Sequence, residues 1–371
     1  MAHAVIEKTW TSCMNVLTQY IAKEILKGSF IALILLLTLF NLFTLTDELK
    51  DLGKGNYNLT AIFSYLALTS PRVCYELVPS AALMGSLFVL GAMGNNRELI
   101  AMRAVGVSIL GIIQSVLVAG SILAVFSICL GEFVAPTTET QAQLLRATAQ
   151  NKPFVMHAKY GLWLREGDKF INIRHLQENN ELADISIYDT TFTQEHPRLQ
   201  SVTHAQKAVY VASNQWRLDT IAQSTISTSQ MQATSQSEQL WQTHIAPDLM
   251  QIAVVNPDNL SLMDLSSYIA FLKSNQQKSH AFQMAFWGRV FNPLVTFVML
   301  LVATPFVISV KRGINVGGRM MIGIVIGMGF NIIDHIFGHI GLIYDMNPLI
   351  ITLLPSIIVS ALSLYALKRV I

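Results

Sequence analysis

The sequence has few charged residues for its length. Only 13% of its 371 residues are Asp, Glu, Lys or Arg, whereas soluble domains contain about 25%. Hydrophobic residues make up 52% of the chain, so much of its surface is expected to face something other than water. A net charge of +2 provides no basic stripe of the kind that nucleic-acid-binding proteins carry.

Cysteine is also scarce, and the motifs of several enzyme classes are absent. Cys13, Cys74 and Cys129 lie in or near apolar stretches, so neither a disulfide framework nor a zinc site is expected. The sequence contains no P-loop motif, no HExxH and no GxSxG. We therefore expect a chain that is not itself an enzyme, carries no ATPase site and uses no cofactor or metal.

Six apolar stretches are long enough, or nearly so, to cross a membrane, whose hydrocarbon core of about 30 Å requires about 20 helical residues. They cover residues 29–45, 60–93, 108–134, 285–310, 320–342 and 348–367. The polar first 28 residues contain no cleavable signal, so the first apolar stretch would direct the chain to the membrane. Residues 16–27 are amphipathic and predict an interfacial helix ahead of the first span.

Lysine and arginine are unevenly distributed among the short loops, which predicts the orientation of the chain. Ten of them fall on one side: Lys8, Lys23, Lys27, Arg97, Arg103, Lys311, Arg312, Arg319, Lys368 and Arg369. On the other side, Lys50 and Lys54 are accompanied by Asp47, Glu48 and Asp51. We therefore expect both termini in the cytoplasm and the segment between the third and fourth spans outside.

That outer segment has the pattern of short β-strands. Its candidate strands are residues 159–165 and 169–175 around Glu166-Gly167-Asp168, residues 184–188, and residues 208–212 and 215–221 around Ser213-Asn214. Such strands predict a sandwich, a jelly roll or an open barrel, with residues 224–238 as a loop or an edge strand. Residues 138–150 and 261–273 are expected to be connecting helices.

The predicted fold is a polytopic α-helical membrane protein of six transmembrane helices with an inserted β-jellyroll-like domain. Residues 1–135 would form the interfacial helix and the first three spans, with a short cytoplasmic helix at about 95–106. Residues 136–275 would form the β domain, and residues 276–371 the last three spans.

The ends of the short cytoplasmic helix carry residues that suit helix termini. Asn95 or Asn96 is expected to cap it, Glu98 and Arg103 suit its first and last turns, and Gly106 is expected to end it. It is either an ordinary surface helix or a coupling helix that docks into a motor subunit, with Leu99, Ile100 and Met102 as its apolar contacts and Arg97 and Glu98 as its polar ones.

Three other features have a functional and a structural interpretation. Arg72 and Glu76, four residues apart in the second span, form either a self-neutralising pair or a site where Arg72 meets an anionic ligand. His335 and His339, beside Asp334, either bind a metal or, as we prefer, pack against a partner helix. The glycine pairs 313/317 and 323/327 allow close helix packing, either within the chain or against another subunit.

Several motifs along the chain resemble those of one transporter family. They are Gly131-Glu132-Phe133-Val134-Ala135-Pro136, Asn96-Arg97-Glu98-Leu99, Ala104-Val105-Gly106, Gly161-Leu162-Trp163, Ile185-Ser186-Ile187-Tyr188, Arg198-Leu199-Gln200-Ser201-Val202 and Asp334-His335-Ile336-Phe337-Gly338. In this order and on this topology, the chain resembles the LptF/LptG family of lipopolysaccharide export permeases, and its LptG branch in particular. The resemblance covers nearly the whole chain.

The resemblance implies a multi-pass ABC transporter permease of the bacterial inner membrane that acts in outer-membrane biogenesis. In this family, LptF and LptG pair as a heterodimer around a cavity, and two copies of the ATPase LptB bind on the cytoplasmic side. Lipopolysaccharide enters from the outer leaflet and passes through the periplasmic β-jellyroll domains to the bridge protein LptC. The expected partners are therefore LptF-like, LptB-like and LptC-like proteins, and lipopolysaccharide.

The resemblance also implies site residues. Glu98 would contact the ATPase, and the predicted coupling site is Arg97, Glu98, Leu99 and Met102. The predicted lipopolysaccharide site is Lys50, Arg72, Arg146, Phe40, Phe43, Ile326, Phe330 and Phe337. Lys50 and Arg146 would meet lipid A phosphates, whereas Thr44, Asp51 and Gln143 occupy positions where relatives have a basic residue. The apolar members would line the acyl-chain cavity, with lipid-facing or core packing as the alternative for each.

Two other functions remain open. The chain is alternatively a mechanotransmission or lipoprotein-extraction permease, or a membrane scaffold that transports nothing. Co-purification with an ATPase whose activity depends on Glu98 would favour a permease over a scaffold. Lipopolysaccharide bound to the purified complex would favour the exporter.

Overall fold

The computed structural model describes residues 2–150, 162–177, 181–193, 196–212, 214–227, 230–243, 257–309 and 316–370. The chain divides into two compact units. The first, here called the helical unit, comprises Met1–Lys50, Leu66–Glu139 and Gln283–Ile371. The second, here called the sheet unit, comprises Asp51–Tyr65 and Thr140–Phe282. Each is described separately below.

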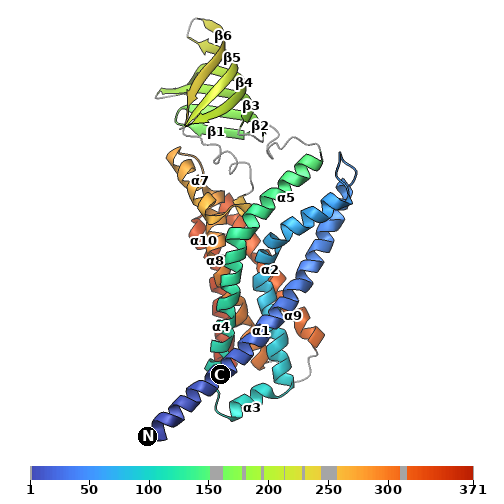
Figure 1. Ribbon diagram of the computed structural model, residues 1–371. Helices are drawn as coiled ribbons and strands as arrows, with labels where there is room; N and C mark the ends of the chain where they lie inside the picture. Colours follow the sequence, from blue (N-terminus) through green and yellow to red (C-terminus); the bar gives the residue numbers. More distant parts are fainter. Residues whose placement is uncertain are drawn as a thin grey trace. The chain divides into compact units, whose positions relative to one another are not determined.

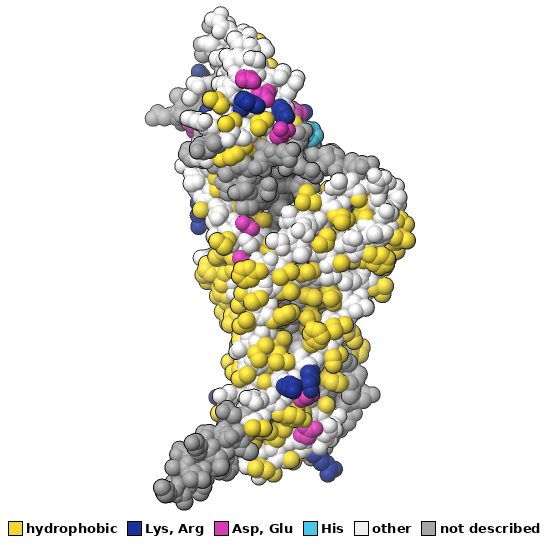
Figure 2. Space-filling view, viewed as in Figure 1, with side chains coloured by type: hydrophobic (Ala, Val, Ile, Leu, Met, Phe, Trp, Pro, Cys, Tyr) yellow, Lys and Arg dark blue, Asp and Glu magenta, His cyan; other side chains and the backbone are white. Residues whose placement is uncertain are grey.

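Six helical segments in the described residues are long and apolar enough to cross a membrane, as the sequence predicts. They contain α1 (Ala2–Glu48), α2 (Leu59–Asn95), α4 (Ile109–Cys129) continued by α5 (Ala135–Ala149), α8 (His280–Ser309), α9 (Val316–Ile343) and α10 (Pro348–Val370). Figure 2 shows hydrophobic side chains covering much of the visible face of the helical unit. The molecule is therefore a polytopic membrane protein.

The second span is the central helix of the helical unit. In its apolar window 72% of the residues are buried, compared with 22% in α1 and 17% in α9. Helices α1 and α2 approach each other closely at Gly28 and Gly85, where a Cβ atom on Gly85 would lie 2.3 Å from the backbone nitrogen of Ser29. Only glycine allows this backbone-to-backbone contact.

The first span differs from the prediction. The α1 helix runs unbroken from Ala2 to Glu48, so residues 16–27 are the first part of the spanning helix and not a separate interfacial helix (Figure 1). The physical reason is packing: Ile21 and Ile25 are fully buried in a cluster with Leu90 of α2 and Ile112 of α4. Their apolar side is satisfied by protein contacts, and the helix has no reason to turn.

The third span also differs from the prediction at its end. A five-residue π-helix, Leu130–Val134, joins α4 to α5 without a break. It ends two residues before Pro136, whose missing N–H disrupts α-helical hydrogen bonding. A π segment is one way in which a helix absorbs such an interruption. The connecting helix expected at residues 138–150 is thus a direct extension of the membrane helix (Figure 1).

The glycines of α9 settle one open alternative. Cβ atoms on Gly323 and Gly327 would meet Met84 and Ser80 of α2, at 3.1 and 3.3 Å. This pair therefore mediates packing within the chain. The surroundings of the other predicted pair, residues 313 and 317, lie outside the described residues.

The sheet unit contains one antiparallel sheet of six described strands, in the order β1-β2-β3-β4-β5-β6 (Figure 1). The strands are β1 (Leu162–Glu166), β2 (Lys169–Gln177), β3 (Glu181–Thr193), β4 (His196–Ala212), β5 (Gln215–Ile226) and β6 (Met231–Gln242). Gly167 (φ +59°) and Asn214 (φ +64°) lie in the β1–β2 and β4–β5 turns, as their residue types favour. The described strands thus form an up-and-down meander, an order that the sequence left open.

The core of the sheet unit lies on one face of this sheet. Ile171, Ile185 and Trp216 are fully buried there, and α7 (Leu262–Ser274) packs against the same cluster. Burial raises the pKa of Tyr268 of α7 to about 12, which keeps its phenol neutral. The predicted connecting helix at residues 261–273 is confirmed, with Ser261 as its N-cap.

The composition of β6, the last described strand, follows from its position in the sheet. Every residue of β6 except Trp241 is exposed, and β6 lies at the edge of the sheet. Its Ser, Thr and Gln side chains therefore face solvent at the edge of the sheet and are not part of the core. Of the predicted segment 224–238, the first three residues end β5, and the edge strand begins at Met231.

Candidate functional site

The short helix between the second and third spans is α3 (Glu98–Ala104), with Glu98 in its first turn and Arg103 in its last. Gly106 ends it as expected: its φ is +99°, and the amides of Gly106 and Val107 donate to the carbonyls of Arg103 and Met102. The start of α3 differs from the prediction. The N-cap residue is Arg97, in a left-handed conformation (φ 62°), and its side chain makes no capping hydrogen bond.

The two faces of α3 have different roles. Leu99 and Met102 pack inward against the cluster formed by α1, α2 and α4. Ile100 and Val105 point outward and are 49% and 73% exposed. Leu99 and Met102 are half-buried and help to hold the helix in place, whereas Ile100 and Val105 are the more exposed apolar residues.

Glu98 is connected to the first span. The hydroxyl of Tyr20 on α1 donates a hydrogen bond to its Oε2 atom at 3.3 Å, and the amide of Asn96 lies 3.3 Å from Oε1. A partner that displaced α3 would therefore pull on α1, both through this bond and through the shared apolar cluster.

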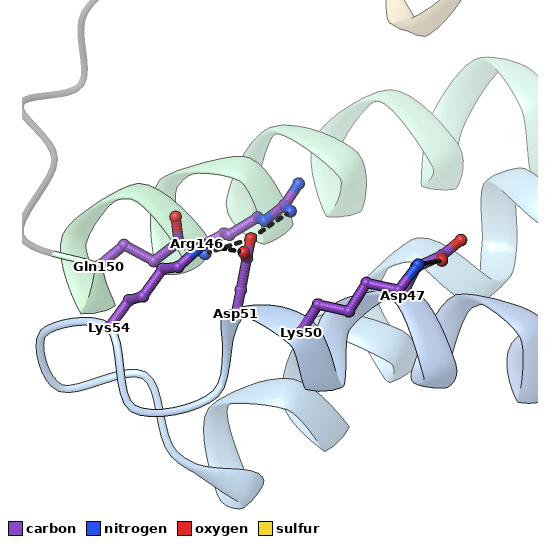
Figure 3. Close-up of polar contacts among 6 residues, drawn as sticks. All are labelled: Asp47, Lys50, Asp51, Lys54, Arg146 and Gln150. Atoms are coloured by element: carbon purple, nitrogen blue, oxygen red, sulfur yellow. Dashed lines mark hydrogen bonds and ion pairs between the residues drawn. The ribbon is translucent and has the colours of Figure 1, made fainter.

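Charged residues gather around Asp51 in the sheet unit (Figure 3). The carboxylate of Asp51 accepts from Lys54 at 2.6 Å, Arg146 at 3.1 Å and the amide of Gln150 at 3.3 Å. The guanidinium of Arg146 also lies over the ring of Tyr65, 5.5 Å from its centroid. The Asp51 side chain is 20% exposed, whereas Arg146 and Lys54 are 34% and 57% exposed.

The loop that carries Lys54 is well anchored. Gly53 and Gly55 adopt positive φ values of 83° and 63°, which lets the chain turn back sharply. The amide of Asn56 donates to the carbonyl of Ala149 at 2.7 Å, and Tyr57 is only 1% exposed. Lys54 is therefore presented from a folded loop that is tied to the end of α5.

Lys50 behaves differently from Arg146. Its amine pairs with Asp47, one turn earlier, at 2.7 Å, and the two side chains are 72% and 73% exposed. Such an exposed pair contributes little to stability and exchanges readily with solvent or a ligand.

Arg72 has two carboxylate partners. Its Nε atom donates to Glu76 at 3.0 Å, and its Nη1 atom lies 3.5 Å from the buried Glu139 of α5. This is the self-neutralising arrangement, extended by a second acid that the sequence did not suggest. Carboxylates that already pair with Arg72 weaken its attraction for an anionic ligand.

The chain matches the family described as "Lipopolysaccharide export system permease LptF/LptG" over residues 19–369. It belongs to this family. The "Lipopolysaccharide export system permease protein LptG" of Escherichia coli K12 is 33% identical to it over 357 residues, covering 96% of this chain and 98% of that protein. The protein of the same name from Haemophilus influenzae is 30% identical, covering 96% of this chain and 99% of the relative.

The apolar residues predicted to line a lipid cavity in this family member fall into two groups. Phe40 and Phe43 of α1 are 42% and 64% exposed and are open to a ligand or to lipid. Phe330 is 6% exposed, and it packs with Ile326 against α2 and α8 inside the helical unit. Phe337 is half-buried. Phe330 is thus a core residue with the half-buried Ile326 packed beside it, while Phe40 and Phe43 remain candidates for the predicted role.

The sequence analysis did not single out Arg289, a buried cation of α8. Arg289 of α8 is 8% exposed and donates to the carbonyl of Gly131, within the π-helix, at 2.8 Å. It lies 5.6 Å from the ring centroid of Tyr75 and 4.0 Å from a carboxylate oxygen of Glu132. The signal was available: Arg289 is the one charged residue of the fourth apolar stretch, residues 285–310.

The histidines of α9 add nothing to the metal interpretation. His335 and His339 are exposed, and Asp334 is half-buried. Among the residues whose positions are described, no three His, Cys, Asp or Glu side chains come together as a metal site would require.

Proposed function

We propose that this chain is the permease subunit of an ABC transporter that extracts lipopolysaccharide from the outer leaflet of the bacterial inner membrane. The observation that carries the proposal is the family match, which spans both the membrane helices and the inserted sheet. The E. coli and H. influenzae relatives are named for the same process and are similar over almost their full length.

The energy source would be a separate subunit. The chain has no P-loop, so ATP hydrolysis requires an LptB-like ATPase that binds on the cytoplasmic side. The α3 helix is the proposed docking element: it exposes Ile100 and Val105, carries Glu98, and is packed onto α1 and α2. A rigid helix with such packing transmits a push from a motor directly to the membrane helices.

The remaining partners follow from the family. An LptF-like permease would complete the transport cavity as a heterodimer, and an LptC-like protein would receive the lipid in the periplasm. The excess of basic residues in the loops on the α3 side favours cytoplasmic termini and a periplasmic sheet unit.

The proposed ligand contacts follow from how each basic side chain is exposed and paired. Lys50 and Arg146 are the candidates for lipid A phosphates, because each is exposed enough to exchange a carboxylate partner for a phosphate. Arg72 is the weakest candidate, since it is shared by Glu76 and Glu139. Phe40 and Phe43 are the proposed contacts for the acyl chains.

The test is purification of the chain with its cellular partners, followed by extraction of bound lipid. We expect a second six-helix permease, an ATPase and lipopolysaccharide to be recovered together. Glu98→Ala should lower ATPase recovery or activity, whereas Glu181→Ala, a matched change in the sheet unit, should alter neither. Intact export with Glu98→Ala would refute the coupling role of α3.

The alternatives give different outcomes in the same experiment. A mechanotransmission or lipoprotein-extraction permease would retain the ATPase but yield no lipopolysaccharide. A scaffold would yield neither ATPase stimulation nor a bound lipid. Recovery of lipopolysaccharide that decreases with Arg146→Glu would support the exporter over both.

A further inference from the structure

We propose that Asp51 acts as an internal anion that occupies the cationic site of Lys54 and Arg146, and so restricts this site to lipid phosphates of high charge. The inference rests on the proposed function for the identity of the natural ligand. It is argued from the contacts that Asp51 makes with Lys54 and Arg146 in this chain.

The geometry of the site is that of an anion clamp. Lys54 and Arg146 approach the same carboxylate from two segments that are 92 residues apart in sequence, at 2.6 and 3.1 Å. Gln150 adds an amide donor at 3.3 Å. An ammonium, a guanidinium and an amide that converge on one group also form the donor set by which proteins hold a phosphate.

The clamp is ordered before any ligand arrives. The Lys54 loop is fixed to the end of α5 by the bond from Asn56 to Ala149, and the Arg146 guanidinium lies against the ring of Tyr65. Preorganised donors lose little conformational entropy on binding. The two cations therefore favour an anion at this position, and Asp51 is the anion that the fold itself provides.

The charges give the clamp its selectivity. The Asp51 carboxylate occupies the donors of Lys54 and Arg146 and so weakens their attraction for other anions. A phosphate monoester, which carries between one and two negative charges at neutral pH, competes with the carboxylate for both cations. A phosphodiester with a single charge gains much less by replacing a carboxylate that is already bound. Asp51 therefore favours the phosphate monoesters of lipid A over ordinary anionic phospholipids.

The experiment compares two lipids on the intact transporter complex in nanodiscs. The probes are lipid A with two phosphate monoesters and phosphatidylglycerol, and lipid bound to the protein is counted by native mass spectrometry. We expect Asp51→Asn to bind about threefold more phosphatidylglycerol than the wild type, since a partly exposed ion pair competes only modestly with a ligand. Asp51→Glu, which keeps the charge, should restore the wild-type ratio.

Several results would overturn the proposed role of Asp51. If Asp51→Asn and a second neutral variant, Asp51→Ser, bind phosphatidylglycerol as the wild type does, Asp51 is not a competing anion. If they bind both lipids more weakly, Asp51 merely holds the loop in place. Lys54→Gln should reverse the gain of Asp51→Asn when the two are combined, and a gain that persists in the double variant would also overturn the proposal.

The outcome is separable from that of the proposed function. A wild-type complex that binds no lipid A would contradict lipopolysaccharide export. The gain of phosphatidylglycerol in Asp51→Asn would still establish the clamp, because it is measured with a different lipid. Conversely, bound lipid A with no effect of Asp51→Asn would leave the exporter intact and refute the clamp.

Discussion

Arg289 illustrates how one side chain can stabilise an irregular segment of a membrane helix. Its guanidinium binds the Gly131 carbonyl in the π-helix and covers the ring of Tyr75, which itself leaves no room for a Cβ on Gly131. A π segment and a proline leave backbone groups without their usual α-helical partners. A buried cation with several donors satisfies such a carbonyl at a position that water does not reach.

Replacing Arg289 should therefore destabilise the helical unit. Arg289→Met keeps most of the volume but removes every donor, and it is expected to cost about 2 kcal/mol, the range for a hydrogen bond to a charged group. Arg289→Lys retains the charge and should cost less. Thermal unfolding of the two purified variants in detergent tests this, and equal melting temperatures would show that the charge is irrelevant.

At the scale of elements, the crossing of α1 and α2 depends on backbone contact. Gly85→Ala would place a methyl group 2.3 Å from the Ser29 nitrogen, and because backbone atoms cannot move aside, the helices must separate. We expect a loss of about 2 kcal/mol, as for overpacked cores.

The matched control for this change is Gly288→Ala in α8. The nearest atom to a Cβ at that position belongs to Thr352, at 3.9 Å, so the methyl group fits without strain. Chemical unfolding followed by intrinsic fluorescence compares the two variants. If Gly288→Ala unfolds as early as Gly85→Ala, the close approach is not the cause.

A second prediction at the scale of elements concerns the two faces of α3. Val105→Asp changes the outward face and should reduce ATPase binding about tenfold while leaving the melting temperature unchanged, since an apolar anchor contributes about 1.4 kcal/mol or more to an interface. Met102→Ser changes the inward face and should instead lower stability by about 1–2 kcal/mol.

Co-purification and thermal unfolding of both α3 variants distinguish these effects. If Val105→Asp unfolds early, the outward face is structural after all. If Met102→Ser loses the ATPase without any loss of stability, the inward face takes part in docking.

At the scale of the whole molecule, we expect the transported lipid to shield the exposed part of α1 from chemical labelling. In a background with Cys13, Cys74 and Cys129 changed to Ser, a cysteine at Phe43 should react with a lipid-soluble maleimide. That reaction should slow when lipopolysaccharide fills the assembled transporter, because Phe43 is 64% exposed in the chain itself. A cysteine at Leu33, which is 7% exposed, should react slowly in both conditions. Labelling at position 43 that ignores lipopolysaccharide would remove Phe43 from the proposed cavity.

The sequence by itself determined the six spans, the inserted sheet and the end of α3. These features rest on local physics: about 20 apolar residues in a row require a membrane, and Gly167, Asn214 and Gly106 allow the positive φ values that their turns and caps need. The same local signals do not reveal whether a helix continues past its apolar stretch. That is why the continuity of residues 16–27 with the first span, and the joining of α4 to α5, were missed.

Only the tertiary structure decided which charges meet and which apolar residues are buried. Asp51 and Arg146 are 95 residues apart, and Arg289 and Gly131 are 158 residues apart. Nothing in either local sequence indicates its partner, because such pairing depends on how helices pack. For the same reason Phe330 and Phe43 are alike in sequence, yet the first lies in the core and the second on the surface. The cationic clamp closed by Asp51 exists only once the loop and α5 are brought together.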